Sequence, residues 1–191
     1  NNYTATKRPR RTDEYSPGGK SGFRPDRALS VYVDMVKKSY PNTPVVIGGI
    51  EASLRRFAHY DYWSDIIMPS ILVDTQADML LYGMSETQIK TLAHGLAKGW
   101  PIHKIKDIPG TCYMSRSLPK GNKYTLISSF EEVSTEKIKF AEAFQIQSRE
   151  QNPFIGSTLV QKHGDLYLVQ LPPAKPLSQS EMDELYRLPF T

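Results

Sequence analysis

Two short apolar runs that end in glycine constrain the fold of this chain more than any other feature. The first covers residues 45–47 and precedes Gly48 and Gly49, and the second covers residues 79–82 and precedes Gly83. Strands of a parallel sheet are apolar on both faces, as these runs are. Because helix-forming sequence follows both turns, we expect the two turns at one edge of a parallel α/β sheet, where such sheets bind ligands.

The rest of the chain alternates predicted helices and strands in the order of a doubly wound α/β sheet. Apolar residues recur at helical spacing over residues 29–36, after a predicted N-cap at Asp26. Ser85 and Gln88 predict a capping box at the start of a further helix. We also predict strands at 71–73, 111–114 and 124–127, helices at 134–150 and 178–186, and a hairpin of 158–161 with 166–170.

Composition limits the class of protein. The 191 residues are 39% hydrophobic and 23% charged, which is typical of a globular domain. No apolar run approaches the roughly 20 residues that a membrane-spanning helix needs. The single cysteine excludes a disulfide or a multi-cysteine metal site within the chain. With no signal peptide, the sequence predicts a cytoplasmic protein, and the missing initiator Met suggests a piece of a longer chain.

Positive charge is concentrated at the start of the chain. Residues 1–25 are rich in proline and glycine and predict an irregular arm. Residues 1–27 hold seven basic and three acidic residues, so this arm carries the whole formal net charge of +4. Such an arm can bind nucleic acid or a nucleotide through phosphate, but it can equally be a solvated segment or pack on its own chain.

The side chains with chemical potential cluster after the first glycine turn. Backbone N–H groups of a glycine turn can hold an anion or a planar ligand, although a tight turn without a ligand has the same sequence. An arginine there can clamp a carboxylate or phosphate, and His59 with Asp61 can relay a proton, but a solvated helix face or an aromatic core cluster explains the same residues. The candidate ligand-facing residues are Gly48, Gly49, Glu51, Arg55, Arg56, His59, Tyr60, Asp61, Gly83 and Glu86.

Other reactive side chains are scattered. His94, His103 and His163 have no partner at the spacing of metal ligands, so we expect none of them to bind a metal. Cys112 is expected to be a small buried hydrophobic residue.

Four segments together resemble one family. They are Tyr15 to Lys20, Arg24 to Arg27, Ile47 to Ser64 with the sequence IGGIEASLRRFAHYDYWS, and Leu81 to Met84. This chain resembles the N-terminal domain of the YgiQ-type radical SAM proteins, the UPF0313 family. The resemblance covers most of the chain, and it implies a Rossmann-like, cobalamin-binding-type fold with helices flanking the sheet. It also implies that Gly48, Gly49, Gly83 and Glu86 line the ligand edge of the domain.

The resemblance also implies what lies outside this chain. The catalytic core of the family binds a [4Fe–4S] cluster through three cysteines and cleaves S-adenosylmethionine, and the single cysteine here means that the core is absent. We therefore expect a basic arm at 1–25, a Rossmann-like domain at 26–171 without its first strands, and a linker at 172–191 toward the radical SAM domain. The Asp-x-His-x-x-Gly motif of cobalamin proteins is missing, which argues against cobalamin.

These observations support three hypotheses. In the first, the chain is an accessory domain that lines or caps the active site of a radical SAM barrel in the same protein, without metal or catalytic residues of its own. In the second, the basic arm makes the chain a nucleic-acid or nucleotide-binding module. In the third, the chain is a structural domain whose glycine turns bind nothing.

Overall fold

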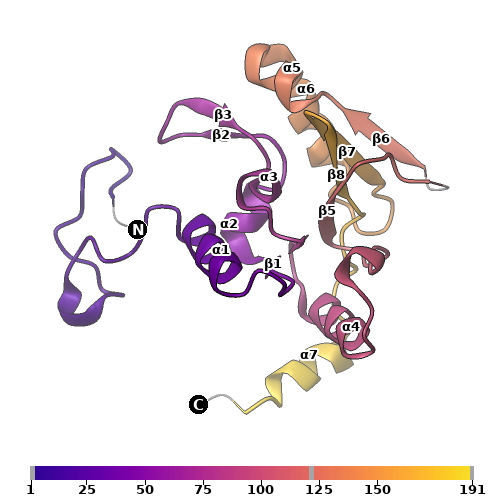
Figure 1. The fold of residues 1–191 in the computed structure, drawn as a ribbon, viewed down its shortest axis with the longest axis horizontal. Coiled ribbons are helices and arrows are strands. Elements are labelled where there is room, and N and C mark those ends of the chain that lie inside the picture. The colour runs from indigo at the N-terminus through magenta and orange to yellow at the C-terminus, as the bar shows by residue number, and fades with distance from the viewer. Residues whose placement is uncertain (1–2, 121–122, 190–191) are drawn as a thin grey trace.

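The computed structural model describes residues 3–120 and 123–189 and shows an α/β fold (Figure 1). A six-stranded sheet has the order β1, β4, β5, β8, β7, β6, and a separate two-stranded ribbon pairs β2 with β3. The strands are β1 Val46–Ile47, β2 His59–Asp61, β3 Ile66–Met68, β4 Met79–Leu81, β5 Thr111–Ser115, β6 Tyr124–Ile127, β7 Thr158–His163 and β8 Leu166–Gln170. The predicted α/β class is confirmed.

The sheet is mixed. Its outer pairs, β1 with β4 and β6 with β7, are parallel, and the three inner pairs are antiparallel. One antiparallel pair follows from the predicted hairpin, which turns at Gly164 between β7 and β8. Another pairs β5 with β4, because β5 enters the sheet beside Leu81, where β4 has just ended, and runs back along β4.

Helices cover the sheet and close its core. They are α1 Ala28–Ser39, α2 Gly49–Leu54, α3 Ile71–Thr75, α4 Glu86–Ala97, α5 Phe130–Thr135, α6 Lys137–Arg149 and α7 Gln179–Tyr186, with short 3₁₀ helices at Pro17–Gly19 and Ile102–Lys104. The main core joins Val33 of α1 and Ile71 of α3 to Leu80, Leu159 and Leu168 of the sheet. A second cluster packs Leu92 of α4 against Met79 and Leu81 of β4. Among the described residues, no helix is long and apolar enough to cross a membrane.

Two predicted elements differ from the structure. Residues 71–73 are the start of helix α3 and form no strand, because Ser70 caps this helix by accepting a hydrogen bond from the Leu72 N–H at 3.2 Å. The strand lies earlier, at β3. The helix predicted at 134–150 is two helices, because the backbone of Glu136 is extended. The first of them, α5, begins at Phe130, directly after a capping box formed by Ser129 and Glu132.

Two predicted caps are also wrong. The N-cap of α1 is Arg27 rather than Asp26. Ser85 precedes α4 as predicted, but its hydroxyl donates to the Gly83 carbonyl at 3.3 Å and makes no capping box with Gln88. The backbone of Ser85 (φ −120°, ψ 15°) lies outside the extended region from which a cap side chain reaches the helix N–H groups.

Candidate functional site

The two glycine turns meet in one pocket at the carboxyl ends of β1 and β4. The parallel register pairs Val46 with Met79 and Ile47 with Leu80, so both strands end side by side. The resulting pocket has a volume of about 360 Å³. We call it the carboxyl-edge pocket, and it is lined by Val46, Ile47, Gly48, Gly49, Leu81, Gly83, Ser85, Glu86 and Ile89.

Glycine is required at this edge for two reasons. A Cβ atom on Gly48 would lie 3.3 Å from the Leu81 carbonyl oxygen, so a side chain would crowd the neighbouring strand. Gly49 (φ +82°) and Gly83 (φ +71°) have left-handed backbone, which strains other residues. Among the described residues, no atom from a more distant part of the chain lies within 4 Å of the position that a Cβ would take at either of these two glycines. Their backbone is therefore open to a ligand.

Glu86 supplies the acidic group of the pocket. It is the first residue of α4, where the helix dipole favours a negative charge. One carboxylate oxygen, Oε2, is buried and has no hydrogen-bond partner among the described residues. Burying such an acceptor without a partner is costly, so a ligand that donates a hydrogen bond here would remove that cost.

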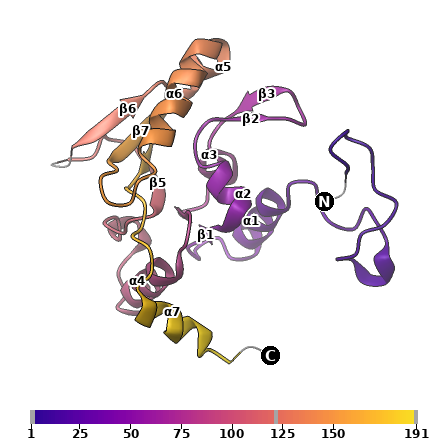
Figure 2. The same cartoon turned by 180° about the vertical axis from the view of Figure 1, so that it is seen from behind.

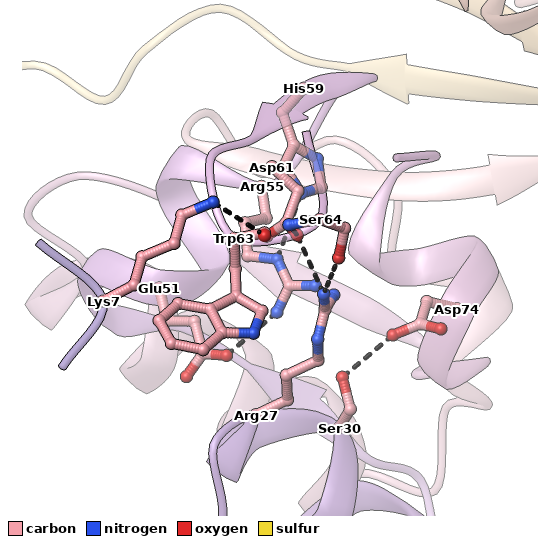
Figure 3. A network of polar contacts seen from close by, with 10 residues as sticks. All are labelled: Lys7, Arg27, Ser30, Glu51, Arg55, His59, Asp61, Trp63, Ser64 and Asp74. Atoms are coloured by element: carbon pink, nitrogen blue, oxygen red, sulfur yellow. Dashed lines mark hydrogen bonds and ion pairs between the residues drawn. The ribbon is translucent and has the colours of Figure 1, made fainter. Parts of the chain in front are cut away.

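A second set of predicted residues forms a connected network beside the pocket (Figure 3). The Arg55 guanidinium donates to Glu51 at 3.0 Å and to His59 Nε2 at 3.2 Å. Because Nε2 accepts this hydrogen bond, the proton of His59 is on Nδ1, which donates to the Phe57 carbonyl at 3.1 Å. Burial lowers the pKa of His59, so this imidazole is neutral at pH 7.

The proposed His59–Asp61 proton relay is not formed. Asp61 accepts hydrogen bonds from Arg27 and from the Ser64 N–H, each at 2.9 Å (Figure 3). Burial opposes the ionised carboxylate, but the hydrogen bonds from Ser64 and the charge of Arg27 outweigh it and lower the pKa of Asp61. This carboxylate therefore ties the β2–β3 ribbon to the start of α1.

The two remaining candidates have partners within the chain. The Arg56 Nε donates to Gln170 Oε1 at 2.6 Å, and the guanidinium also contacts the Ser53 carbonyl and lies 5.0 Å from the centre of the Tyr82 ring. Tyr60 donates to Asp65 at 2.7 Å. Arg56 thus joins the end of α2 to β8, and its contacts are those of a structural residue.

Sequence reasoning missed a second pocket. It lies between the end of α2 and α6, has a volume of about 310 Å³, and is called here the α2–α6 pocket. Its walls include Leu54, His59 and Tyr60 with Phe140 and Phe144 of α6. The spacing of the two phenylalanines, four residues apart on one helix face, was the signal in the sequence.

The single cysteine lies inside the core. Cys112 is fully buried, as predicted, and burial raises the pKa of its thiol to about 12, so the thiol is inert. The part of the chain that the structure describes contains no group of three or more side chains that could hold a metal ion.

The basic arm is partly neutralised by its own chain. Arg24 forms a two-pronged ion pair with buried Asp13, at 2.6 and 2.8 Å, and these hydrogen bonds lower the pKa of Asp13 to about 2. Lys7 donates to the Trp63 carbonyl at 3.0 Å and lies 4.7 Å from the centre of the Tyr62 ring. The arm therefore packs on the tip of the β2–β3 ribbon.

Comparison with known proteins identifies the family of this chain. The family model described as "Radical SAM N-terminal" matches residues 1–191, and the chain belongs to this family. A UPF0313 protein of Clostridium botulinum (strain 657 / Type Ba4) is 54% identical over 190 residues, which is 100% of this chain and 30% of that protein. UPF0313 proteins of Methanocella arvoryzae and Clostridium perfringens are each 49% identical over 191 residues. The chain spans about 30% of the length of these relatives, and no solved structure matches it.

Proposed function

We propose that this chain is the accessory N-terminal domain of a radical SAM enzyme, and that its carboxyl-edge pocket is one wall of an active site. The catalytic domain of the full-length protein would supply the opposite wall. The observation that carries the proposal is an open pocket at paired strand ends, lined by the exposed backbone of Gly49 and Gly83 and by a Glu86 oxygen that has no hydrogen-bond partner among the described residues.

The radical chemistry itself belongs to the other part of the protein. The family implies a [4Fe–4S] cluster and S-adenosylmethionine, but this chain has one cysteine, and its thiol is buried and protonated. The residues present here therefore do not fit a cluster. We leave cobalamin out of the proposal because its Asp-x-His-x-x-Gly motif is missing.

The role of this chain would be to receive and orient a substrate. The glycine backbone lets a flat part of the substrate approach closely, and the Glu86 carboxylate accepts a hydrogen bond from a substrate hydroxyl or amine. Ile89, half-exposed on the first turns of α4, offers an apolar contact at the rim. This combination of apolar walls with one polar anchor is common in small-molecule sites.

The test uses the full-length protein, reconstituted anaerobically with iron and sulfide and supplied with S-adenosylmethionine, a reductant and a small-molecule extract of the source cells that provides the substrate. We expect formation of 5′-deoxyadenosine. Ile89→Trp fills the carboxyl-edge pocket with an indole ring and should lower that rate about tenfold, or roughly 1.4 kcal/mol, while iron content stays unchanged.

Lys90→Trp is the matched control, because Lys90 follows Ile89 on the same helix but does not line the pocket. It should keep the wild-type rate. Absence of 5′-deoxyadenosine from a protein with a full cluster would refute radical SAM activity. A wild-type rate in Ile89→Trp would instead show that this pocket is not a wall of the site.

A further inference from the structure

Helices α2 and α6 share an unusual amount of exposed apolar surface. Ile50 and Leu54, one turn apart on α2, are 81% and 71% exposed, and Phe144 on α6 is 63% exposed. Leu54, Phe144 and Tyr60 all line the α2–α6 pocket. A contiguous apolar surface that surrounds a hollow is characteristic of an interaction site. We call this set of four side chains the α2–α6 surface.

The α2–α6 pocket carries little available charge. The basic residues of its lining are Arg56, whose guanidinium is held by Gln170 and the Ser53 carbonyl, and His59, which is neutral at pH 7, and no described residue of the lining is acidic. A surface of this kind does not attract phosphate or a strongly hydrated ligand. It suits apolar side chains of another folded protein, since charged residues are depleted at the centre of protein interfaces.

The α2–α6 surface is continuous with the carboxyl-edge pocket. Helix α2 begins at Gly49, which lines the carboxyl-edge pocket, and ends at Leu54, which lines the α2–α6 pocket. At 1.5 Å per residue, the two ends are roughly 8 Å apart. Helices α2 and α6 are both seen on the near side of the molecule in Figure 2. A folded body seated on α2 would therefore also close the carboxyl-edge pocket.

We propose that the α2–α6 surface docks the remainder of the full-length protein. In the relatives, about 70% of the polypeptide lies outside the part that this chain matches. Because that remainder is covalently attached, its effective concentration is high, and a modest apolar patch is enough to hold it. This inference rests on the proposed function, because the occupant is the domain that the proposed function requires.

The test is hydrogen–deuterium exchange on the full-length protein. In the wild type, the backbone amides of α2 and α6 should exchange slowly, because the docked domain covers Ile50, Leu54 and Phe144. These three side chains are exposed in the chain alone. The double substitution Leu54→Asp and Phe144→Asp should speed exchange in these peptides about tenfold. Without the interface, the two helices open locally more often. Peptides from the buried strands β7 and β8 should remain protected, which shows that the variant is folded.

The control is Phe154→Asp with Ile155→Asp. These side chains are 71% and 79% exposed in the loop after α6 and lie outside both pockets, so exchange in α2 and α6 should not change. Equal exchange of α2 and α6 in the wild type and the Leu54/Phe144 variant would overturn the proposal. So would a wild-type dimer that the variant breaks, because a second copy would then cover the surface.

The two proposals fail separately. Formation of 5′-deoxyadenosine by a protein whose α2 and α6 are unprotected would refute docking at the α2–α6 surface alone. Protected helices in a protein that forms no 5′-deoxyadenosine would refute the proposed function and leave the docking surface in place.

Discussion

His163 is the most unusual single residue of the chain. It ends β7, is 6% exposed, stacks on the Phe130 ring at 5.6 Å, and has no hydrogen-bond partner on either ring nitrogen among the described residues. Burial lowers its pKa from 6.5 to about 4, although the nearby Glu131 charge acts in the opposite direction. The ring is therefore neutral in the folded protein at pH 7 and behaves as an aromatic core residue.

This residue should make the protein less stable in mild acid. The unfolded chain takes up a proton at His163 near pH 6.5 and the folded chain only near pH 4, so stability is lost as the pH falls through that window. His163→Phe removes this effect and keeps the contact with Phe130. Relative to the wild type, we expect the variant to gain about 2 kcal/mol between pH 8 and pH 5, measured by urea unfolding.

His94→Gln serves as the control, because His94 is exposed on α4. Its stability should follow the wild-type pH dependence. If His163→Phe showed the same pH dependence as the wild type, the histidine would not be the group that titrates.

For single residues, the sequence predicted which ones lie at the carboxyl-edge pocket. It did not predict which groups the nearby side chains contact. Gly48, Gly49, Gly83 and Glu86 lie together because each follows the end of one of two adjacent strands, and that property is local in sequence. Arg56 was a candidate for the same site, yet its partner is Gln170, 114 residues away. No spacing rule connects residues that far apart.

Gln161 holds several elements together. It is fully buried on β7, its side-chain oxygen accepts from the Ala58 N–H at 2.8 Å, and its side-chain nitrogen donates to the Ser128 carbonyl at 2.9 Å. The segment between α2 and β2 is thereby fastened to β7 and to the start of α5. Gln161 and Ala58 also line the α2–α6 pocket.

Gln161→Leu should therefore destabilise the fold. The leucine leaves the buried Ala58 N–H without an acceptor, which costs about 1–3 kcal/mol in the free energy of unfolding. Chemical denaturation followed by circular dichroism measures the change. Gln147→Leu, in the same pocket but half-exposed, should change stability by less than about 0.5 kcal/mol. Equal stability of the two variants would contradict the assigned role of Gln161.

Element boundaries were predictable where a local pattern defines them. Helix α4, strand β4 and the β7–β8 hairpin begin and end close to the predicted residues, because apolar periodicity and turn glycines act locally. The division between α5 and α6 was missed, since the apolar pattern continues across Glu136 while its backbone is extended.

For the whole molecule, the contacts of the arm weaken the nucleic-acid hypothesis. Arg24, Arg27, Lys7 and Arg10 are engaged by groups of the same chain. In the described part of the chain, the arm cations whose side chains form neither a hydrogen bond nor an ion pair with any group are Arg8, Arg11 and Lys20. Three cations are too few for tight binding at physiological salt.

We expect weak binding of single-stranded RNA, with a slope of about −2 when log affinity is plotted against log salt concentration. Fluorescence anisotropy over a salt series measures this slope. Replacing Arg8, Arg11 and Lys20 by alanine should bring this slope close to zero. Lys98→Ala, a substitution at the end of α4 and outside the arm, should leave the slope unchanged. A steep slope that survives the triple substitution would mean that another surface binds RNA.

Patterns between near neighbours in the sequence were enough to predict the α/β class, the residues of most elements, the position of the glycine turns and the membership of the family. Only the packing of whole elements showed that β5 is antiparallel to both β4 and β8, that Asp61 pairs with Arg27 rather than His59, and that α2 and α6 share one surface. The physical reason is that hydrogen bonds and apolar contacts between distant segments depend on how whole elements pack. A short motif contains no information about its partner across the fold.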